Sequence, residues 1–152
     1  MGRVGGQMVI EDLVGQELVS EWRAIEQGRI DEFARATDDP QWIHVDPEAA
    51  AAGPFGTTIA HGFLTLSLVV PMFAEALPPL EGYGMTLNYG LNCVRFTSPV
   101  PSGARIRGRF QIEDVEDVAL GKQARVGTTI ELEGQEKPAC VAEALFRFVN
   151  PV

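Results

Sequence analysis

Two side chains suited to proton transfer lie five residues apart in this chain. Asp39 and His44 belong to the stretch Asp39-Pro40-Gln41-Trp42-Ile43-His44, which cannot be helical throughout because it contains a proline. Positioned imidazoles and carboxylates are common general acids and bases in enzymes. A segment of this kind can curl so that the two side chains meet. One water held between them would give up a proton while another proton is returned to a substrate.

A second motif follows seventeen residues after His44. His61-Gly62-Phe63 lies near the start of an apolar run over residues 59–77. The first turn of a helix has backbone N–H groups without helical partners and lies at the positive end of the helix dipole. Such a donor at Gly62 would stabilise negative charge that develops on a thioester or ester oxygen, and glycine allows close approach. The alternative is that Gly62 only permits tight packing.

Each candidate also has a purely structural interpretation. An aspartate before a proline is common in turns, and a single histidine is often just a hydrogen-bonded core residue. His61 is either a catalytic partner or, as the pattern favours, a packing residue at a helix start. The amide of Gln41 either orients substrate or water, or is exposed. The joint occurrence of Asp39 and His44 beside the His61-Gly62 motif favours an acid–base site.

A metal site is the other chemistry that these residue types allow. Asp39, His44, Asp46 and His61 together contain two histidines and two carboxylates, which could bind a divalent metal. The His-Val-Asp spacing is not that of a helical ligand pair, and no cysteine is near, so we predict no metal. No Gly-x-Ser-x-Gly, Walker or GxGxxG motif is present, and we predict no cofactor.

The composition is that of one ordinary globular domain over residues 1–152, with 45% hydrophobic and 22% charged residues. The net charge of -9 argues against binding to nucleic acid or to an anionic membrane surface. Basic residues nevertheless gather in the last third of the chain. They form either a solvated strand face or a site for one anionic ligand. They are Arg95, Arg105, Arg107, Arg109, Lys122, Arg125, Lys137 and Arg147.

The cysteines and the apolar segments indicate a cytoplasmic protein. Cys93 and Cys140 lie far apart inside apolar, strand-like runs, so both are predicted to be buried thiols. The first seven residues contain no apolar signal region. The run over residues 59–77 is too polar and too interrupted to cross a bilayer.

The first half of the chain is predicted to be mostly helical. Residues 1–7 are expected to form a loose tail, and a short strand is expected within residues 17–22. Helical spacing of apolar residues begins at Ile30 and ends before Pro40. Residues 40–58 form a long irregular crossing with a helical turn or two over residues 47–52. Residues 59–76 are apolar on every face, which predicts one helix buried all round and bent at Pro71.

The second half is predicted to be an antiparallel sheet, because the apolar period changes to two. Alternating or strongly apolar segments cover residues 85–93, 105–112, 125–133 and 140–148. A curved sheet wrapped around the apolar helix would bury both elements, which is an α+β architecture. A helix face left uncovered would need a second subunit, so we predict an isologous homodimer.

These motifs together resemble the MaoC-like, (R)-specific enoyl-CoA hydratase family of hot-dog proteins. The family motif reads Asp, any residue, Asn, Pro, any residue, His, any residue, Asp, followed by His-Gly at the head of the central helix. Residues 39–46 and His61-Gly62 match it, and residues 94–100 are similar to a family strand that reads Arg-Phe-x-x-Pro-Val. Three residues depart from the family pattern. Gln41 replaces Asn, Trp42 replaces Pro and Asp38 replaces Gly, and this version looks like the nodulation-protein-N-like subgroup.

The resemblance, which covers residues 17–149, implies a hot-dog fold, a curved antiparallel sheet around a long buried helix. It implies reversible hydration of trans-2-enoyl thioesters to (R)-3-hydroxyacyl thioesters, with acyl-CoA or acyl carrier protein as the partner. Asp39 and His44 would be the catalytic pair, Gly62 the donor to the thioester carbonyl, and Gln41 a substrate-binding amide. A hot-dog thioesterase and a non-catalytic acyl-thioester-binding module are the alternatives.

Overall fold

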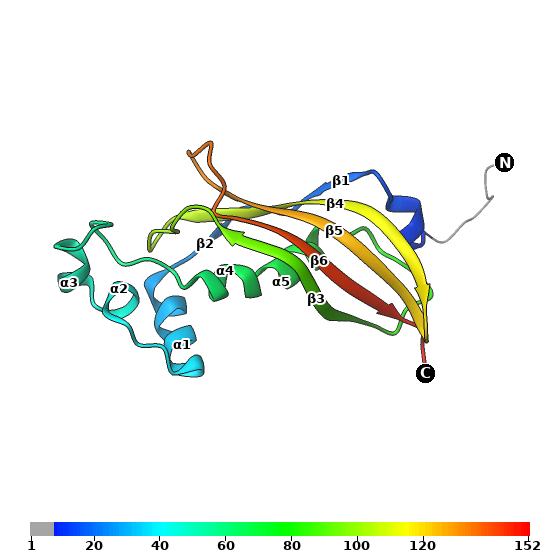
Figure 1. The fold of residues 1–152 in the computed structure, drawn as a ribbon, viewed down its shortest axis with the longest axis horizontal. Helices are drawn as coiled ribbons and strands as arrows, with labels where there is room; N and C mark the ends of the chain where they lie inside the picture. The colour runs from blue at the N-terminus through cyan, green and yellow to red at the C-terminus, as the bar shows by residue number, and fades with distance from the viewer. Residues whose placement is uncertain (1–7) are drawn as a thin grey trace.

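The computed structural model describes residues 8–152, so the predicted loose tail over residues 1–7 lies outside the described residues. Six strands form one antiparallel sheet in the order β1-β4-β5-β6-β3, and β2 also pairs with β4 (Figure 1). The strands are β1 (Glu17–Val19), β2 (Arg23–Ala24), β3 (Met85–Phe96), β4 (Arg105–Val118), β5 (Gly121–Leu132) and β6 (Cys140–Val149). The predicted sheet is therefore present. Of the short strand expected over residues 17–22, only residues 17–19 form a strand, β1, and the strand β2 that follows was not predicted.

Alternation of burial over residues 124–132 of β5 and 144–148 of β6 gives the sheet one buried face. The buried side chains of β4, β5 and β6 form the core together with those of the helices on the concave side of the sheet. The register puts Phe110 opposite Thr128 and Ala124 opposite Phe146, so large side chains face small ones across the strands. This half-buried pattern is what the period of two predicts.

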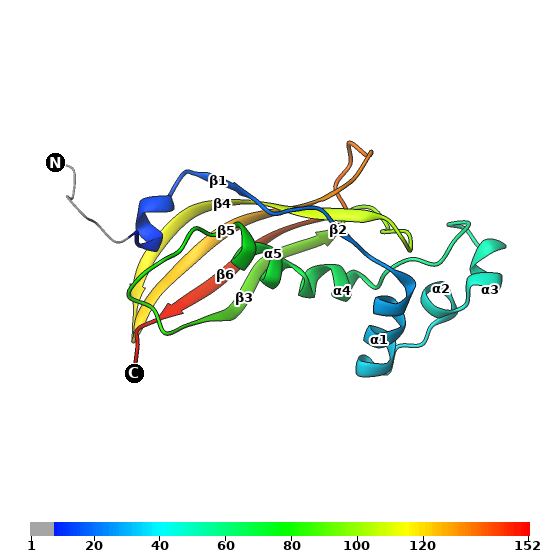
Figure 2. The same cartoon turned by 180° about the vertical axis from the view of Figure 1, so that it is seen from behind.

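Two groups of helices complete the chain. A 3₁₀ turn, Ile10–Leu13, precedes β1, and a cluster of α1 (Gln27–Thr37), α2 (Trp42–Val45) and α3 (Pro47–Ala51) follows β2. This cluster lies beyond one end of the sheet, whereas α4 (Gly62–Ser67) and α5 (Val69–Ala76) run along the concave face (Figures 1 and 2). The helical turn predicted over residues 47–52 is α3, which has Pro47 at its first position. The helix α2 was not predicted.

The central helix differs from the prediction in two ways. It breaks at Leu68, three residues before the bend expected at Pro71. Pro71 therefore lies in the first turn of α5, where the N–H that proline lacks would have no helical acceptor. It is also not buried all round: Phe63 is 68% exposed and Val70 is 37% exposed. The sheet covers only one side of α4 and α5, since a single curved sheet cannot enclose a helix.

The uncovered side of the helices borders an apolar groove of about 510 Å³ beside the edge strand β3. Leu87, Tyr89 and Leu91 on this strand are about half exposed. Because β3 is an edge strand, Cys93 is exposed, and the prediction that it is buried was wrong. Cys140 is buried as predicted, and burial raises the pKa of its thiol to about 11.

The outer face of the sheet carries most of the basic residues that gather in the last third of the chain. Arg107 and Arg109 both contact Glu131, and Arg109 also contacts Glu17. Burial alone would raise the pKa of Glu131, but hydrogen bonds from the two guanidinium groups hold that pKa below its ordinary value. Carboxylates therefore already neutralise these arginines, which supports the solvated-strand interpretation. No helix among residues 8–152 is long and apolar enough to cross a membrane.

Two glycines offer opposite tests of this packing. A Cβ at Gly108 in β4 would lie 2.3 Å from the ring of Phe110, whereas a Cβ at Gly28 in α1 would meet nothing within 4 Å. We expect Gly108→Ala to lower the free energy of unfolding by about 1–3 kcal/mol through overpacking. Gly28→Ala should raise it by about 0.5 kcal/mol, since alanine favours helices. Urea denaturation measures both, and equal effects at the two sites would contradict the packing described.

Candidate active site

The end of α1 positions Asp39. The helix stops at Asp38, which adopts the left-handed conformation (φ 56°, ψ 37°), and the amides of Asp38 and Asp39 both donate to the carbonyl of Ala34. A left-handed residue just past a helix is usually glycine, although aspartate tolerates this conformation better than most residues. The turn directs the chain away from the helix axis. It leaves the side chain of Asp39 52% exposed, so that its carboxylate is accessible to water.

The short helix α2 positions His44. The amide of His44 donates to the carbonyl of Gln41 at 2.9 Å, and this hydrogen bond closes the turn. The His44 ring is buried, and its Nδ1 lies 2.7 Å from the carbonyl oxygen of Ile59. A carbonyl only accepts, so Nδ1 carries the hydrogen. In the neutral ring Nε2 is then an acceptor.

His61 lies between these two residues at the start of α4. Its ring is 3% exposed and stacks on that of His44, with the ring centroids 3.8 Å apart and the planes 24° apart. Its Nε2 lies 3.0 Å from the main-chain oxygen of Asp39. Its Nδ1 is buried without a hydrogen-bond partner among the described residues. The sequence interpretation of His61 as a packing residue therefore covers only part of its contacts.

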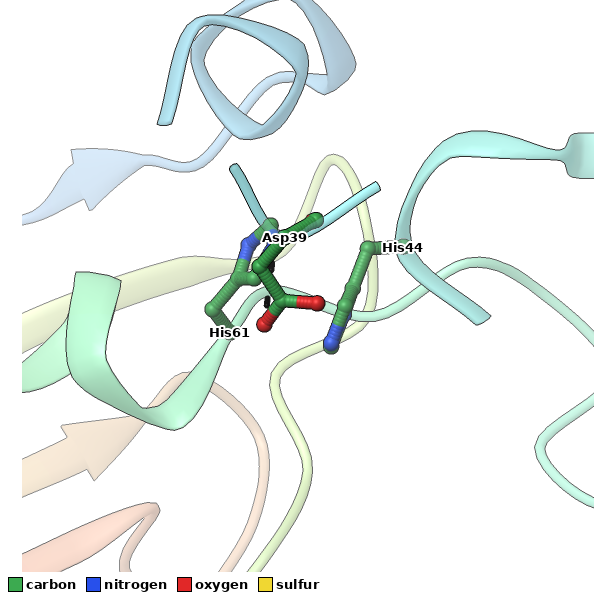
Figure 3. Close-up of side chains that lie close together, drawn as sticks. All are labelled: Asp39, His44 and His61. Atoms are coloured by element: carbon green, nitrogen blue, oxygen red, sulfur yellow. Dashed lines mark hydrogen bonds and ion pairs between the residues drawn. The ribbon is translucent and has the colours of Figure 1, made fainter. Parts of the chain in front are cut away.

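The three side chains converge although they come from three segments. One carboxylate oxygen of Asp39 and one ring nitrogen of each histidine lie within 4.8 Å of one another. Figure 3 shows the carboxylate of Asp39 beside the two imidazole rings. A water can donate and accept hydrogen bonds of about 2.8 Å, so it spans groups up to roughly 5.6 Å apart. Asp39 and His44 are thus close enough to hold one water in common.

A cavity of about 290 Å³ opens beside this cluster. His44 lines it together with Gly62 and Thr65 of α4 and the aromatic side chains of Phe55 and Phe96. Within the described part of the chain the amide of Gly62 makes no hydrogen bond. A mostly apolar cavity with a few converging polar groups is typical of a small-molecule site.

Gly62 also has a packing role. A Cβ at this position would lie 3.0 Å from Cδ2 of Phe96, whose ring covers the start of α4. Phe96 in turn meets Phe63 edge to face, with the centroids 5.9 Å apart. Both sequence interpretations of Gly62 are therefore compatible with the structure, because the same residue packs against an aromatic ring and presents its amide beside the cavity.

Not all of the predicted residues join the cluster. Gln41 caps α2 through its carbonyl, and its side chain is exposed and does not line the cavity beside His44. Asp46, considered as a metal ligand, instead accepts from the amide of Ala49 and caps α3. Thr65 and Phe96 were missed as cavity residues, because nothing in their spacing distinguishes them from core positions.

The donor set of Asp39, His44 and His61 also has the residue types of a divalent metal site. Lone pairs on imidazole nitrogens lie in the ring plane. Two rings that stack only 24° from parallel therefore direct these lone pairs side by side rather than toward a common point. The arrangement fits a water-binding acid–base cluster better than a tetrahedral metal site.

The chain matches the family model described as MaoC like domain over residues 9–136. It is 54% identical to 3-hydroxyacyl-thioester dehydratase Z of Mycobacterium tuberculosis over 137 residues, which is 90% of this chain and 88% of that protein. It is 49% identical to Nodulation protein N of Rhizobium leguminosarum bv. viciae over 134 residues, covering 85% and 82% of the two chains.

Solved structures agree on the fold. The structure of R-hydratase PhaJ1 from Pseudomonas aeruginosa, in its unliganded form, superposes with a TM-score of 0.73 at 25% identity, over 91% of this chain and 83% of that one. The fold shared with these neighbours is the hot-dog fold, so that prediction from the sequence is confirmed.

A double-mutant cycle at Gly62 and Phe96 tests how the start of α4 is packed. We expect Gly62→Ala to lower the free energy of unfolding by about 1–2 kcal/mol, because the new methyl group displaces the ring. In a Phe96→Ala background the same substitution should be neutral or mildly stabilising, since alanine is the better helix former. Urea denaturation of the four proteins gives the coupling energy, expected near 1 kcal/mol. Equal costs in both backgrounds would contradict the contact.

Proposed function

The chain belongs to the MaoC-like domain family, and we propose that its Asp39–His44 pair adds water to trans-2-enoyl thioesters, giving (R)-3-hydroxyacyl thioesters reversibly. The chain is a hydratase or dehydratase acting on 3-hydroxyacyl thioesters, as its relatives of 54% and 25% identity are. The observation that supports the proposed mechanism is the convergence of a carboxylate and an imidazole within 4.8 Å, beside a cavity lined by Gly62.

The pair acts on one shared water. One of the two groups takes a proton from this water as its oxygen bonds to C3 of the enoyl group. Electrons of the C2–C3 double bond move toward the thioester oxygen, and the other group delivers a proton to C2. One water is consumed and no other reactant is needed. Because both groups can reach the same water, we assign the acid and base roles to the pair and not to one residue.

The amide of Gly62 stabilises the intermediate. During addition negative charge grows on the thioester oxygen, and a pre-aimed N–H donor lowers the energy of that state. The amide of Gly62 is in the first turn of α4, where the helix supplies it no acceptor. From there the acyl chain follows the apolar wall that Phe63, Leu66 and Val70 form along the groove.

The carrier of the acyl group is CoA or acyl carrier protein. The phosphates of either carrier would need a basic contact. Among the basic residues considered for an anionic ligand, five contact carboxylates, namely Arg105, Arg107, Arg109, Lys122 and Arg125. Arg95 is exposed, donates only to the carbonyl of Val94 among the described residues, and adjoins Phe96 at the cavity. We therefore favour Arg95 as the phosphate contact.

Hydration of crotonyl-CoA, followed by the loss of enoyl absorbance, tests the mechanism. We expect Asp39→Asn and His44→Ala each to lower kcat by about 10²–10⁴, the usual contribution of a general acid or base. Asp46→Asn is the matched control, because its side chain caps α3 and asparagine also caps helices. Wild-type turnover in both active-site variants would remove this mechanism. Release of free thiol without loss of the double bond would indicate a thioesterase instead, and tight binding without turnover would indicate a binding module.

The uncovered groove and edge strand support a homodimer as part of the function. The strand β3 has unpaired backbone groups along its outer edge, and apolar side chains of α4, α5 and β3 lie exposed beside it. A second copy placed against this edge in an isologous dimer would bury these side chains and roof the groove.

Sedimentation velocity tests the dimer. We expect the protein to sediment with twice its chain mass of 16.5 kDa, and Leu91→Arg on β3 to shift it to the monomer, because both copies would bring the charge to the interface. Leu120→Arg is the control, since Leu120 is 76% exposed in the turn between β4 and β5. A monomeric wild-type protein, or a Leu91→Arg dimer, would contradict this arrangement.

A further inference from the structure

We propose that His61 is a positioning residue that holds both members of the Asp39–His44 pair, a role that rests on the proposed hydration mechanism. His61 contacts each of the two residues by a different part of its ring. Through Nε2 it reaches the main chain of Asp39 at 3.0 Å, and through its face it stacks on His44 at 3.8 Å. Among residues 8–152, no other side chain is hydrogen-bonded to or stacked on both Asp39 and His44.

The contact with Asp39 fixes a residue that has little other support. Asp39 follows a left-handed turn, its side chain is half exposed, and only its amide is bonded to α1. The hydrogen bond from His61 goes to its main-chain oxygen, whereas its carboxylate oxygen Oδ2 lies 3.9 Å from Nε2. That distance is too long for a hydrogen bond. His61 thus anchors the backbone of Asp39 and leaves the carboxylate to the water.

The contact with His44 fixes the ring plane. The carbonyl of Ile59 holds one edge of the His44 ring at 2.7 Å, which still permits rotation about that bond. The face of His61 removes this freedom, and the ring of Phe33 packs against His61 at a tilt of 54°, with the centroids 4.9 Å apart. The stack of the two imidazoles, supported by Phe33, therefore sets the direction in which Nε2 of His44 faces the cavity.

The unpartnered nitrogen of His61 shows that packing alone does not account for the residue. A phenyl ring would fill the same space without burying Nδ1 unbonded, and such orphaned groups are rare in native proteins. A glutamine would supply the N–H donor without the ring. Of the three side chains, histidine alone both donates to Asp39 and stacks on His44.

The hydrogen-bond partners also fix opposite tautomers. Nε2 of His61 faces a carbonyl, so it carries the hydrogen, whereas in His44 it is Nδ1 that carries it. In the neutral state the acceptor of His61 is Nδ1, which is buried, so Nε2 of His44 is the imidazole acceptor available to a water at the cavity.

Two variants separate the two contacts. His61→Phe keeps the stack but loses the donor to Asp39, and His61→Gln keeps a donor at the position of Nε2 but loses the stack. With crotonyl-CoA, we expect kcat to fall about 100-fold in His61→Phe, the usual effect of a small misplacement of a reacting group, with KM close to that of wild type. His61→Gln should recover part of kcat, because His44 is also held by Ile59.

Phe73→Leu is the stability control, since Phe73 is buried in α5 against Phe110 and Phe146, away from the cluster. It should lower Tm without lowering kcat. Wild-type kcat in both His61 variants, or a loss of kcat in Phe73→Leu that matches theirs at equal Tm loss, would overturn the positioning role. An inactive wild-type protein would instead overturn the proposed function, so the two failures are distinguishable.

Nitrogen NMR of the imidazoles gives an independent readout, because the chain contains only two histidines. At mildly alkaline pH we expect one ring with the hydrogen on Nδ1 and one with it on Nε2. His61→Gln should remove the second signal and leave the first. Two rings of the same tautomer would overturn the geometry on which the proposal depends.

Discussion

The site depends on one short strut, the extended segment of Ile59 and Ala60. The amide of Ile59 donates to the carbonyl of Ile43 at 3.0 Å, and its carbonyl holds the ring of His44 at 2.7 Å. One residue later, the amide of Ala60 donates to the carbonyl of Val100 at 2.8 Å. The helical cluster α1–α3 extends beyond the sheet, and this segment is one of its links to the sheet, together with the strand β2 that leads into α1 (Figure 1). Both residues of the strut are buried, which protects these bonds from competition with water.

This dependence separates stability from the geometry of the site. The core between the sheet and α5 contains large, fully buried side chains such as Phe73, Phe110 and Phe148, and it would fold with or without correct placement of Asp39. The proposed catalytic pair lies outside the core cluster, with Asp39 just past the end of α1 and His44 in the short helix α2. The positions of Asp39 and His44 therefore depend on directed interactions. These are the hydrogen bond from His44 to the carbonyl of Ile59 and the contacts of the His61 ring with both residues. Hydrogen bonds and ring stacks have the directionality that hydrophobic burial lacks.

The sequence was sufficient to predict the sheet, the fold class and the candidates Asp39 and His44, because period and spacing are local properties. It was not sufficient to predict burial that depends on which other element packs against a strand or helix. Cys93 and Cys140 both lie in apolar, strand-like runs, and only the strand order places one on an edge strand and the other inside the sheet. The apolar faces of α4 and α5 predicted that these helices are buried, but they did not indicate which element would cover each face. The stack of His61 on His44 joins residues seventeen apart through the strut, which no pattern of residue types indicates.

The departure of Asp38 from the family glycine has a conformational explanation. The residue at this position is left-handed, with φ of 56°, which glycine adopts without strain and which aspartate adopts at a moderate cost of about 1–2 kcal/mol. A residue with a side chain restricts the unfolded chain more than glycine does, which offsets part of that cost. The second carboxylate also brings negative charge next to Asp39 on the solvent side, while the two imidazoles lie on the other. The chain therefore has a charged residue in a left-handed conformation where glycine is usual in the family.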